Sequence, residues 1–239
     1  MLNVAVLVSG GGTNLQAILD AKAAGALPHA KIALVLASKP GVYALERASK
    51  AGVPGIVVAR KSYAAPEEYD AALLAALREH RIDVVVLAGF LSILGPSVIT
   101  AYPERILNVH PSLIPSFCGA GYYGLRVHEA ALAKGVKVTG ATVHFVNEVP
   151  DGGRILLQQA VDVLPGDTPE TLHRILKKRR CSIAKTRAKP AQTAADAMLP
   201  ERAAYRNSPV SGGISFCRIS ALRDRQKPSF KLYSKTRKM

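Results

Sequence analysis

Hydrophobic runs alternate with amphipathic stretches along the chain as far as about residue 176. Short apolar runs, typical of buried strands, occupy residues 2–8, 32–37, 56–59, 84–88 and 106–109. Apolar residues recur at helical spacing over residues 15–22, 43–51, 66–80, 122–133 and 168–176. Strands that alternate with helices indicate βαβ units, in which the strands run parallel and the helices cover the sheet.

The last two predicted strands are connected differently. Residues 138–146 and 155–163 are strand-like and are joined by a short turn that contains Asp151-Gly152-Gly153. A connection of this length favours an antiparallel hairpin. We therefore predict an α/β fold with an open, mostly parallel, doubly wound sheet and an antiparallel C-terminal edge.

The pattern ends at about Leu176. Residues 177–239 show no apolar period and are interrupted by prolines at positions 190, 200, 209 and 228. The net charge of +15 also lies here: residues 1–175 have 15 Lys and Arg against 14 Asp and Glu, and residues 176–239 have 17 against 3. We predict a folded domain over residues 1–176 and a basic tail of low order over residues 177–239, able to bind polyanions non-specifically.

Composition narrows the class of protein further. The sequence has no uncharged apolar run of membrane-spanning length, and its first residues lack the basic region of a secretory signal. Its three cysteines, Cys118, Cys181 and Cys217, are far apart and have no metal-binding spacing. We expect a cytoplasmic protein that needs neither a membrane nor a metal.

The first candidate for chemistry is the segment Asn108-Val109-His110-Pro111, which follows an apolar run. Residues i and i+2 of a strand point to the same side, so Asn108 and His110 should project together. Pro111 ends the strand, and this edge is where open α/β sheets bind their ligands. The alternative is that Asn108 caps the strand and His110 is a core histidine.

A glycine-rich turn follows the first predicted strand. Ser9-Gly10-Gly11-Gly12-Thr13-Asn14 opens a helix, and its main-chain N–H groups favour a phosphate. Leu15 replaces the third glycine of a dinucleotide fingerprint, and no lysine follows as in a P-loop. We predict a monophosphate site in this turn, residues 9–14. The alternative is an ordinary turn between strand and helix.

Polar residues also mark the predicted hairpin. Alternation places Thr142 and His144 on one side of their strand, and Asp151 lies in the turn that follows. These side chains suit the lining of a site. The alternatives are a solvent-exposed strand face and ordinary turn chemistry at Asp-Gly-Gly.

Five segments occur together in a distinctive order and spacing: SGGGTNLQAI, VVVLAGFLSIL, NVHPSLIPSFCGAGYYG, GATVHFV and DGG. Over residues 1 to about 175 the chain resembles the folate-dependent phosphoribosylglycinamide formyltransferases, also called glycinamide ribonucleotide transformylases. The Asn-x-His-Pro-Ser-Leu element is shared with other formyltetrahydrofolate-using enzymes. The Ser-Gly-Gly-Gly-Thr-Asn opening points to the glycinamide ribonucleotide branch.

The resemblance implies formyl transfer from 10-formyltetrahydrofolate, as co-substrate, to the amine of glycinamide ribonucleotide in purine biosynthesis. Asn108 and protonated His110 would donate to the charged oxygen, and Asp151 would keep His110 cationic. Thr142 and His144 would support this network. Gly12, Thr13 and Asn14 would bind the ribose phosphate. The folate would contact Leu91, Ser92, Ile93, Leu94 and Asn108, with residues 146–150 lining the pterin pocket.

The resemblance also implies small-molecule substrates and no metal. We expect a monomer or homodimer that binds nucleic acid, if at all, only non-specifically through the tail. The chain departs from the family at two places. From Lys177 the family's acidic helix is replaced by a basic segment of the kind that a shifted reading frame produces, and Pro66 stands where relatives often have arginine. Two other functions stay open: another formyltetrahydrofolate-using transferase or hydrolase, or a degenerate enzyme domain with a polyanion-binding tail.

Overall fold

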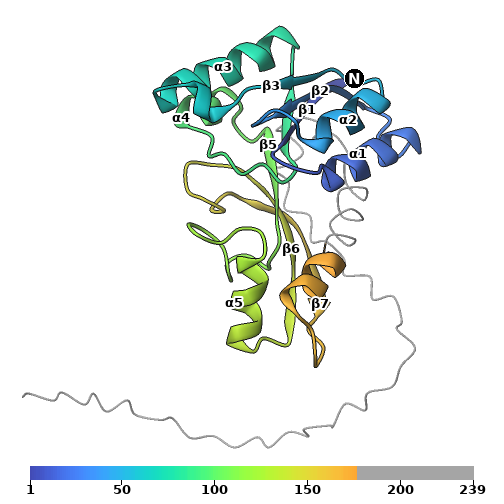
Figure 1. Ribbon diagram of the computed structural model, residues 1–239, viewed down its shortest axis with the longest axis vertical. Helices are drawn as coiled ribbons and strands as arrows, with labels where there is room; N and C mark the ends of the chain where they lie inside the picture. Colours follow the sequence, from blue (N-terminus) through green and yellow to red (C-terminus); the bar gives the residue numbers. More distant parts are fainter. Residues whose placement is uncertain (177–239) are drawn as a thin grey trace, which may run out of the picture. The chain divides into compact units, whose positions relative to one another are not determined.

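The computed structural model describes residues 1–176, and the predicted basic tail, residues 177–239, lies outside the described residues. The strands are β1 (Leu2–Val8), β2 (Ala30–Ala37), β3 (Gly55–Val57), β4 (Val84–Leu87), β5 (Ile106–His110), β6 (Val138–Phe145) and β7 (Ile155–Asp162). The helices are α1 (Thr13–Ala23), α2 (Tyr43–Lys50), the short 3-10 helix η1 (Arg60–Ser62), α3 (Pro66–Glu79), α4 (Pro96–Ala101) and α5 (Arg126–Lys134) (Figure 1). The predicted segment 168–176 is helical from residue 169.

The strands form one sheet in the order β3-β2-β1-β4-β5-β6-β7. The first five strands of the chain pair in parallel, whereas β6 is antiparallel to both β5 and β7. The predicted mostly parallel sheet with an antiparallel C-terminal edge is therefore confirmed. The chain order reverses between β1 and β4, because β2 and β3 extend one way and β4 and β5 the other.

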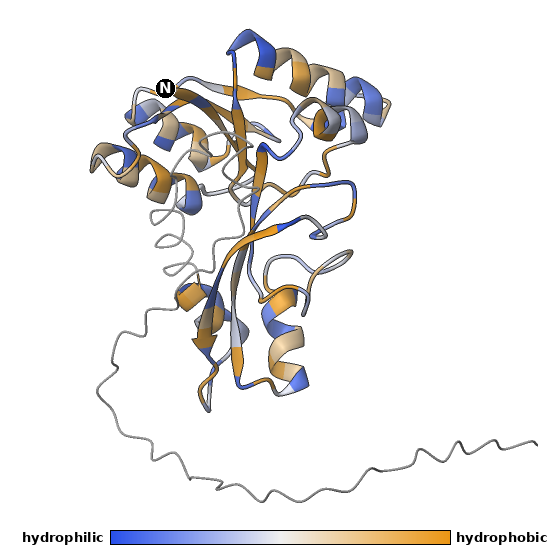
Figure 2. Ribbon diagram, turned by 180° about the vertical axis from the view of Figure 1, so that it is seen from behind, coloured by the Kyte–Doolittle hydropathy of each residue, from blue (hydrophilic) through white to orange (hydrophobic). Residues whose placement is uncertain are grey.

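Helices cover both faces of the parallel part of the sheet because the strands are apolar on both sides. Val4, Val6 and Val8 of β1 pack in a cluster with residues of α1 and α2. Ala5 and Leu7 of the same strand pack on the opposite face, with residues of α3 and α4. The orange strands between mixed helices in Figure 2 show this pattern. A continuous apolar run, rather than an alternating one, is what a strand buried on both faces requires.

Two helical segments differ from the sequence prediction. The helix expected from residue 122 begins at Arg126, because Gly121 and Gly124 have φ angles of 87° and 58°, outside the right-handed helical region. Helix α4 was not predicted, because six residues form fewer than two turns and show little periodicity. The carboxylate of Asp70 holds its start by accepting hydrogen bonds from the Gly95 N–H and the Ser97 hydroxyl, at 3.0 and 2.9 Å.

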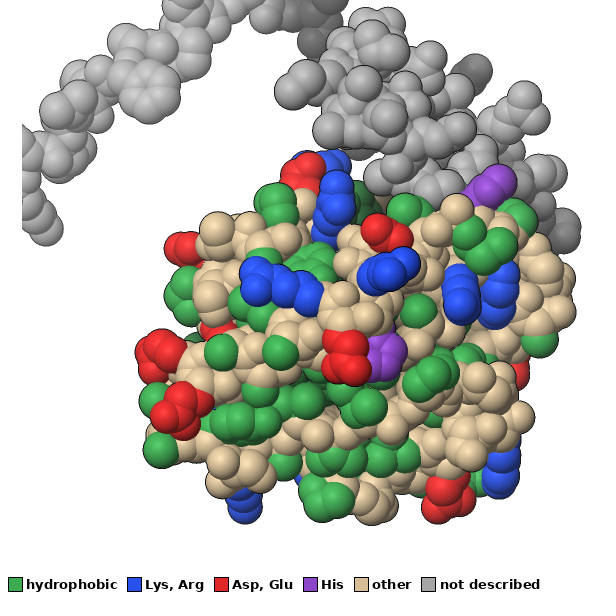
Figure 3. Space-filling view, turned by 90° about the horizontal axis from the view of Figure 1, so that it is seen from above, with side chains coloured by type: hydrophobic (Ala, Val, Ile, Leu, Met, Phe, Trp, Pro, Cys, Tyr) green, Lys and Arg blue, Asp and Glu red, His purple; other side chains and the backbone are tan. Residues whose placement is uncertain are grey.

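Among residues 1–176, no helix combines the length and the apolar character needed to cross a membrane. On the face shown in Figure 3, Lys and Arg side chains are interspersed with Asp and Glu. This distribution agrees with the near-zero charge balance of residues 1–175, and this face carries no continuous basic surface.

Candidate active site

Three strand ends bring the predicted site segments to one edge of the sheet. Leu7 of β1 pairs with Leu87 of β4, and Leu87 pairs with Asn108 of β5. The glycine-rich loop after β1 and the Asn108–His110 segment therefore leave the sheet at the same, carboxyl edge. This edge, next to the reversal of strand order, is where open α/β sheets form ligand sites.

The register of β5 and β6 places four polar side chains on one side of these strands. Asn108 pairs with His144, and His110 pairs with Thr142. In each strand the two residues are separated by one position and so point the same way. His110 is 4% exposed and His144 1%, so both side chains are buried.

Asp151 joins this cluster from the loop between β6 and β7. One carboxylate oxygen, Oδ2, lies 3.3 Å from His110 Nδ1 and accepts a 2.9 Å hydrogen bond from the Gly119 N–H. The other, Oδ1, lies 3.4 Å from both His144 Nε2 and Asn108 Nδ2. The structure thus brings together the three predicted catalytic residues and His144.

The backbone around Asp151 is shaped by two unusual positions. Asp151 itself has a φ of 55°, a left-handed conformation that Asp and Asn adopt more readily than other side chains. At Gly153, a Cβ would lie 1.8 Å from the Phe145 carbonyl oxygen, so only glycine fits there. The Asp-Gly-Gly sequence is therefore required by the turn as well as by the position of the carboxylate.

The cluster favours the charged form of Asp151. Burial by itself raises the pKa of this carboxyl group, but hydrogen bonds from His144 and the Gly119 N–H lower it, as does the charge of His110. The combined effect holds the pKa of Asp151 below its usual value. Asp151 is therefore ionised at neutral pH and can hold a neighbouring cation.

The contacts of His110 favour the imidazolium form. Its Nε2 lies 2.8 Å from the Phe117 carbonyl oxygen, and its Nδ1 faces the Asp151 carboxylate. A carbonyl and a carboxylate oxygen both accept hydrogen bonds, so both ring nitrogens are best satisfied when each carries a proton. The position of the Phe117 carbonyl also means that Nε2 can reach a substrate only when this carbonyl moves aside.

His144 Nε2 can either accept or donate a hydrogen bond, depending on the protonation state of the ring. Its Nδ1 lies 2.8 Å from the Phe145 carbonyl, which fixes a proton on that atom. Its Nε2 lies 3.1 Å from Asn108 Nδ2. A neutral His144 accepts from the Asn108 amide, and a protonated one donates to Asp151, so the cluster is satisfied in either state.

Thr142 contacts the loop that follows β5. Its hydroxyl donates to the Ser112 carbonyl at 2.7 Å and accepts from the Ile114 N–H at 3.1 Å. It also accepts a hydrogen bond from Gln158 Nε2 at 3.1 Å. Thr142 therefore anchors the loop that follows β5, and its support of the charged network stays a prediction.

The glycines of the loop between β1 and α1 differ in how closely neighbouring residues surround them. Gly12 has a φ of 68°, and a Cβ there would lie 2.6 Å from the Ala44 Cβ of α2. A Cβ at Gly10 or Gly11 would meet nothing within 4 Å. A side chain at position 12 would therefore collide with α2 whether or not a ligand is bound, and the phosphate site at Gly12 stays a prediction.

These contacts predict opposite outcomes for two substitutions. Gly12→Val should lower the melting temperature and weaken both substrates together, because it strains the backbone and collides with α2. Gly11→Val should keep the melting temperature and raise KM only for the phosphate-bearing substrate. Thermal unfolding and KM for each substrate check this. A Gly11→Val variant with an unchanged KM for the phosphate substrate would contradict the phosphate site.

Residues 91–94, which are predicted to contact folate, differ in how far they are buried. Leu91 and Ile93 are 67% and 85% exposed, whereas Leu94 is only 6% exposed and packs in the core with α3 and α4. Leu94 therefore offers no side chain to a ligand. The segment is tied to the glycine-rich loop, because the Leu91 N–H donates to the Ser9 hydroxyl at 2.8 Å and the Ser9 N–H donates to the Gly89 carbonyl at 3.1 Å.

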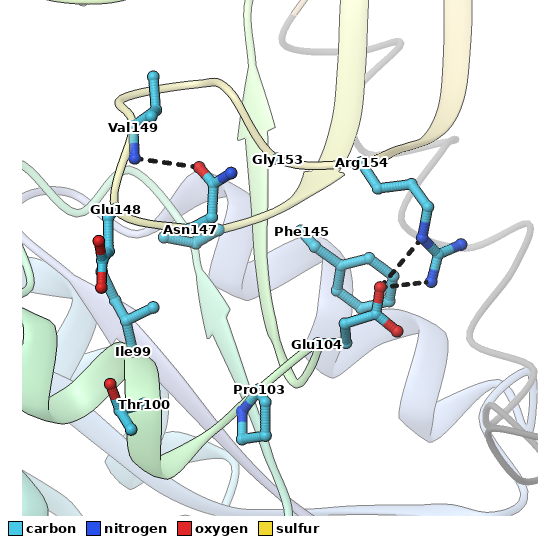
Figure 4. Close-up of a pocket in the computed structure, with 11 residues that line it drawn as sticks. Ile99, Thr100, Pro103, Glu104, Phe145, Asn147, Glu148, Val149, Gly153 and Arg154 are labelled. Atoms are coloured by element: carbon cyan, nitrogen blue, oxygen red, sulfur yellow. Dashed lines mark hydrogen bonds and ion pairs between the residues drawn. The ribbon is translucent and has the colours of Figure 1, made fainter.

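A pocket of about 500 Å³ lies beside the loop that carries Asp151 (Figure 4). One wall contains the Arg154–Glu104 ion pair at 3.1 Å, with Arg154 4.7 Å from the centre of the Phe145 ring. The lining residues are Ile99, Thr100, Pro103, Glu104, Phe145, Val146, Asn147, Glu148, Val149, Gly153 and Arg154. Residues 146–149 of the predicted pterin lining thus lie on a pocket, whereas Pro150 and residues 91–94 do not line this one.

Sequence reasoning missed the backbone groups of the site. The Gly119 N–H and the Phe117 carbonyl contact Asp151 and His110, and both belong to the long loop between β5 and α5. The only available signal was the density of glycines and aromatic residues in this loop. Within residues 1–176, no cluster of three or more His, Cys, Asp or Glu side chains could hold a metal ion.

Comparison with known proteins gives consistent matches. The family model described as Formyl transferase matches residues 2–185. The phosphoribosylglycinamide formyltransferase of Haemophilus influenzae is 44% identical over 170 residues, which cover 71% of this chain and 77% of that protein. The trifunctional purine biosynthetic protein adenosine-3 of Drosophila melanogaster is also 44% identical, over 176 residues that cover 73% of this chain. The chain spans only 13% of that much longer relative.

Solved structures agree with the sequence matches. Glycinamide ribonucleotide transformylase 1 from Symbiobacterium toebii has a TM-score of 0.73 and 43% identity, covering 77% of this chain and 84% of that one. Phosphoribosylglycinamide formyltransferase from Bacillus halodurans has a TM-score of 0.72 and 38% identity, covering 77% and 91%. With the shared sheet, the polar cluster at its carboxyl edge and a family match over most of its length, this chain belongs to the formyl transferase family.

Proposed function

We propose that the protein transfers the formyl group of 10-formyltetrahydrofolate to the amine of glycinamide ribonucleotide in purine biosynthesis. The observation that supports this most directly is the Asp151 carboxylate held among His110, His144 and Asn108 at the carboxyl edge of the sheet. The glycine-rich loop at the same edge supplies main-chain donors for a phosphate. Relatives named for this activity are 40–44% identical to the chain.

The reaction forms a bond between the amine nitrogen and the formyl carbon, and breaks the bond between that carbon and the folate nitrogen. One proton leaves the amine, and one is gained by the folate nitrogen. Negative charge develops on the formyl oxygen, and the Asn108 amide and His110 imidazolium are the donors that would stabilise it. A preorganised donor of this kind contributes about 2.7–4 kcal/mol in enzymes that use an oxyanion hole.

His110 also suits the proton transfer. As an imidazolium it can release a proton to the leaving nitrogen, and Asp151 keeps the ring oriented and cationic before that step. The proton from the amine would pass to Asp151 or through water beside it. Because Nε2 of His110 contacts the Phe117 carbonyl, we infer that substrate binding shifts this part of the loop between β5 and α5.

The two substrates would approach the cluster from different sides. Main-chain groups of Gly12, Thr13 and Asn14 would bind the ribose phosphate at the start of α1. The exposed apolar side chains of Leu91 and Ile93, the polar Ser92 and the pocket formed by residues 146–149 would contact the folate. A cytoplasmic location, and a monomeric or dimeric state, remain predictions.

The direct test is a transfer assay with the purified full chain. We expect formylated glycinamide ribonucleotide and tetrahydrofolate to appear in equal amounts from 10-formyltetrahydrofolate, with neither product formed when one substrate is omitted. Transfer to a different amine would favour another transferase of this family. Release of formate without an acceptor would favour a hydrolase, and no turnover with any acceptor would favour a degenerate domain.

A further inference from the structure

Arg47 of α2, which was not among the predicted site residues, reaches the glycine-rich loop. Its Nε donates to the Gly11 carbonyl at 2.8 Å, and its Nη1 donates to Gln16 Oε1 at 2.8 Å. Its Cζ lies 4.8 Å from the centre of the Tyr43 ring. Its Cδ also lies beside Gly12, because a Cβ added to that glycine would be 3.4 Å from the Arg47 Cδ. One side chain therefore joins the loop, α1 and α2.

These contacts determine where the donors of the loop point. In a planar trans peptide, the C=O of one residue and the N–H of the next point in opposite directions. Because Arg47 binds the Gly11 carbonyl, the Gly12 N–H is directed away from α2. The Ala44 N–H donates to the Gly10 carbonyl at 3.3 Å, which directs the Gly11 N–H away from α2 in the same manner.

Consecutive N–H groups directed to one side form the kind of concave site that binds anions. Within the described residues, neither the Gly11 nor the Gly12 N–H donates to a protein acceptor. The orientation of the guanidinium is itself maintained, since Gln16 Nε2 donates to Asp20 Oδ1 at 2.8 Å and leaves Oε1 for Arg47. Arg47 thus holds the loop in the conformation that presents its donors and adds a positive charge beside them.

We propose that Arg47 is a positioning residue for the phosphate of glycinamide ribonucleotide, acting through the peptide between Gly11 and Gly12. This inference rests on the proposed function. It concerns binding of one substrate, so KM for glycinamide ribonucleotide should depend on Arg47 while kcat and KM for the folate should not.

Arg47→Met tests the inference, because it keeps the side-chain stem over Gly12 and removes the donors. Loss of a charge-assisted hydrogen bond that orients the binding donors should raise KM for glycinamide ribonucleotide at least roughly tenfold. Changes in kcat and in KM for 10-formyltetrahydrofolate should stay within about twofold. Stabilisation of the protein by inorganic phosphate, measured as a rise in melting temperature, should also be smaller than in wild type.

Lys50→Met is the matched control. Lys50 lies on the same helix with its Nζ 5.6 Å from the centre of the same Tyr43 ring, but the described structure shows no hydrogen bond from it to the loop. Its substitution removes the same charge and should leave KM for glycinamide ribonucleotide within about twofold, because surface charges are largely screened by salt. Gln16→Leu removes only the acceptor of the Arg47 Nη1 hydrogen bond. It should also raise KM for glycinamide ribonucleotide, but by less than Arg47→Met does.

Three results would overturn the inference. Equal rises in KM for Arg47→Met and Lys50→Met would show that only charge matters. A parallel rise in KM for both substrates, or a fall in kcat, would show a general structural effect. An unchanged KM in both Arg47→Met and Gln16→Leu would show that the loop does not depend on this side chain. Failure of the proposed function would instead appear in the wild-type protein, as the absence of formyl transfer to glycinamide ribonucleotide.

Discussion

His110→Ala is expected to lower kcat by roughly 10³-fold or more, because the substitution removes both an oxyanion donor and a proton donor. KM for each substrate should change far less, since these roles belong to the transition state. Steady-state kinetics with both substrates, together with equilibrium binding of glycinamide ribonucleotide, measure the two effects separately.

The control for this variant is His29→Ala, which removes an exposed histidine far from the cluster in sequence and should leave kcat unchanged. The fold of His110→Ala should be checked by its melting temperature, because the alanine leaves the Phe117 carbonyl and Asp151 each with one partner fewer. A variant that is folded and turns over near the wild-type rate would refute the assignment of His110.

Asp151→Asn is expected to lower kcat by roughly 10²-fold or more, because a neutral amide cannot hold the His110 imidazolium or accept a proton. Asparagine tolerates the φ of 55° at this position, and its amide oxygen can still accept from the Gly119 N–H. The loop should therefore keep its shape, and the loss should appear in kcat more than in KM. Asp162→Asn, at an exposed position at the end of β7, should be neutral.

The same variant should alter stability in acid. The pKa of Asp151 is lower in the folded protein than its usual value of 3.8, so its carboxylate stabilises the folded state above that pH. This stabilisation should be lost as pH falls through 3.8 toward the lowered pKa. Wild type should therefore exceed Asp151→Asn in free energy of unfolding near neutral pH, and the difference should shrink below about pH 4. A difference that is constant from neutral to acid pH would refute the charged network.

Much of the fold followed from local pattern. The uninterrupted apolar run of β1 predicted a strand covered on both faces, and the packing of Val4 and Val6 on one side and Ala5 and Leu7 on the other agrees with this. The spacing of Asn108 and His110 predicted a shared direction, because a strand has a period of two. Both features depend only on the backbone geometry of a single strand, which neighbouring residues determine.

The convergence of the site was decided by tertiary structure. Hydrophobic periodicity and turn chemistry do not show that Asp151 meets His110 and Asn108, and only the family resemblance implied it. The contact depends on the register between β5 and β6 and on a turn with a left-handed residue. Gly119 and Phe117 make their contacts through backbone atoms, which every residue type carries, so composition does not reveal them. The Arg47 guanidinium reaches the Gly11 carbonyl only because α2 packs beside the loop.

The sequence by itself thus determined the sheet, the edge to which the candidate site segments converge and the residue types available there. Tertiary structure alone decided that the Thr142 hydroxyl anchors the loop after β5, and that a Cβ at Gly12 would collide with α2. It also decided that Leu94 is part of the core. The physical reason is that hydrophobic period and turn chemistry act over a few residues, whereas these contacts join segments separated by about 20 to 40 positions and follow from packing.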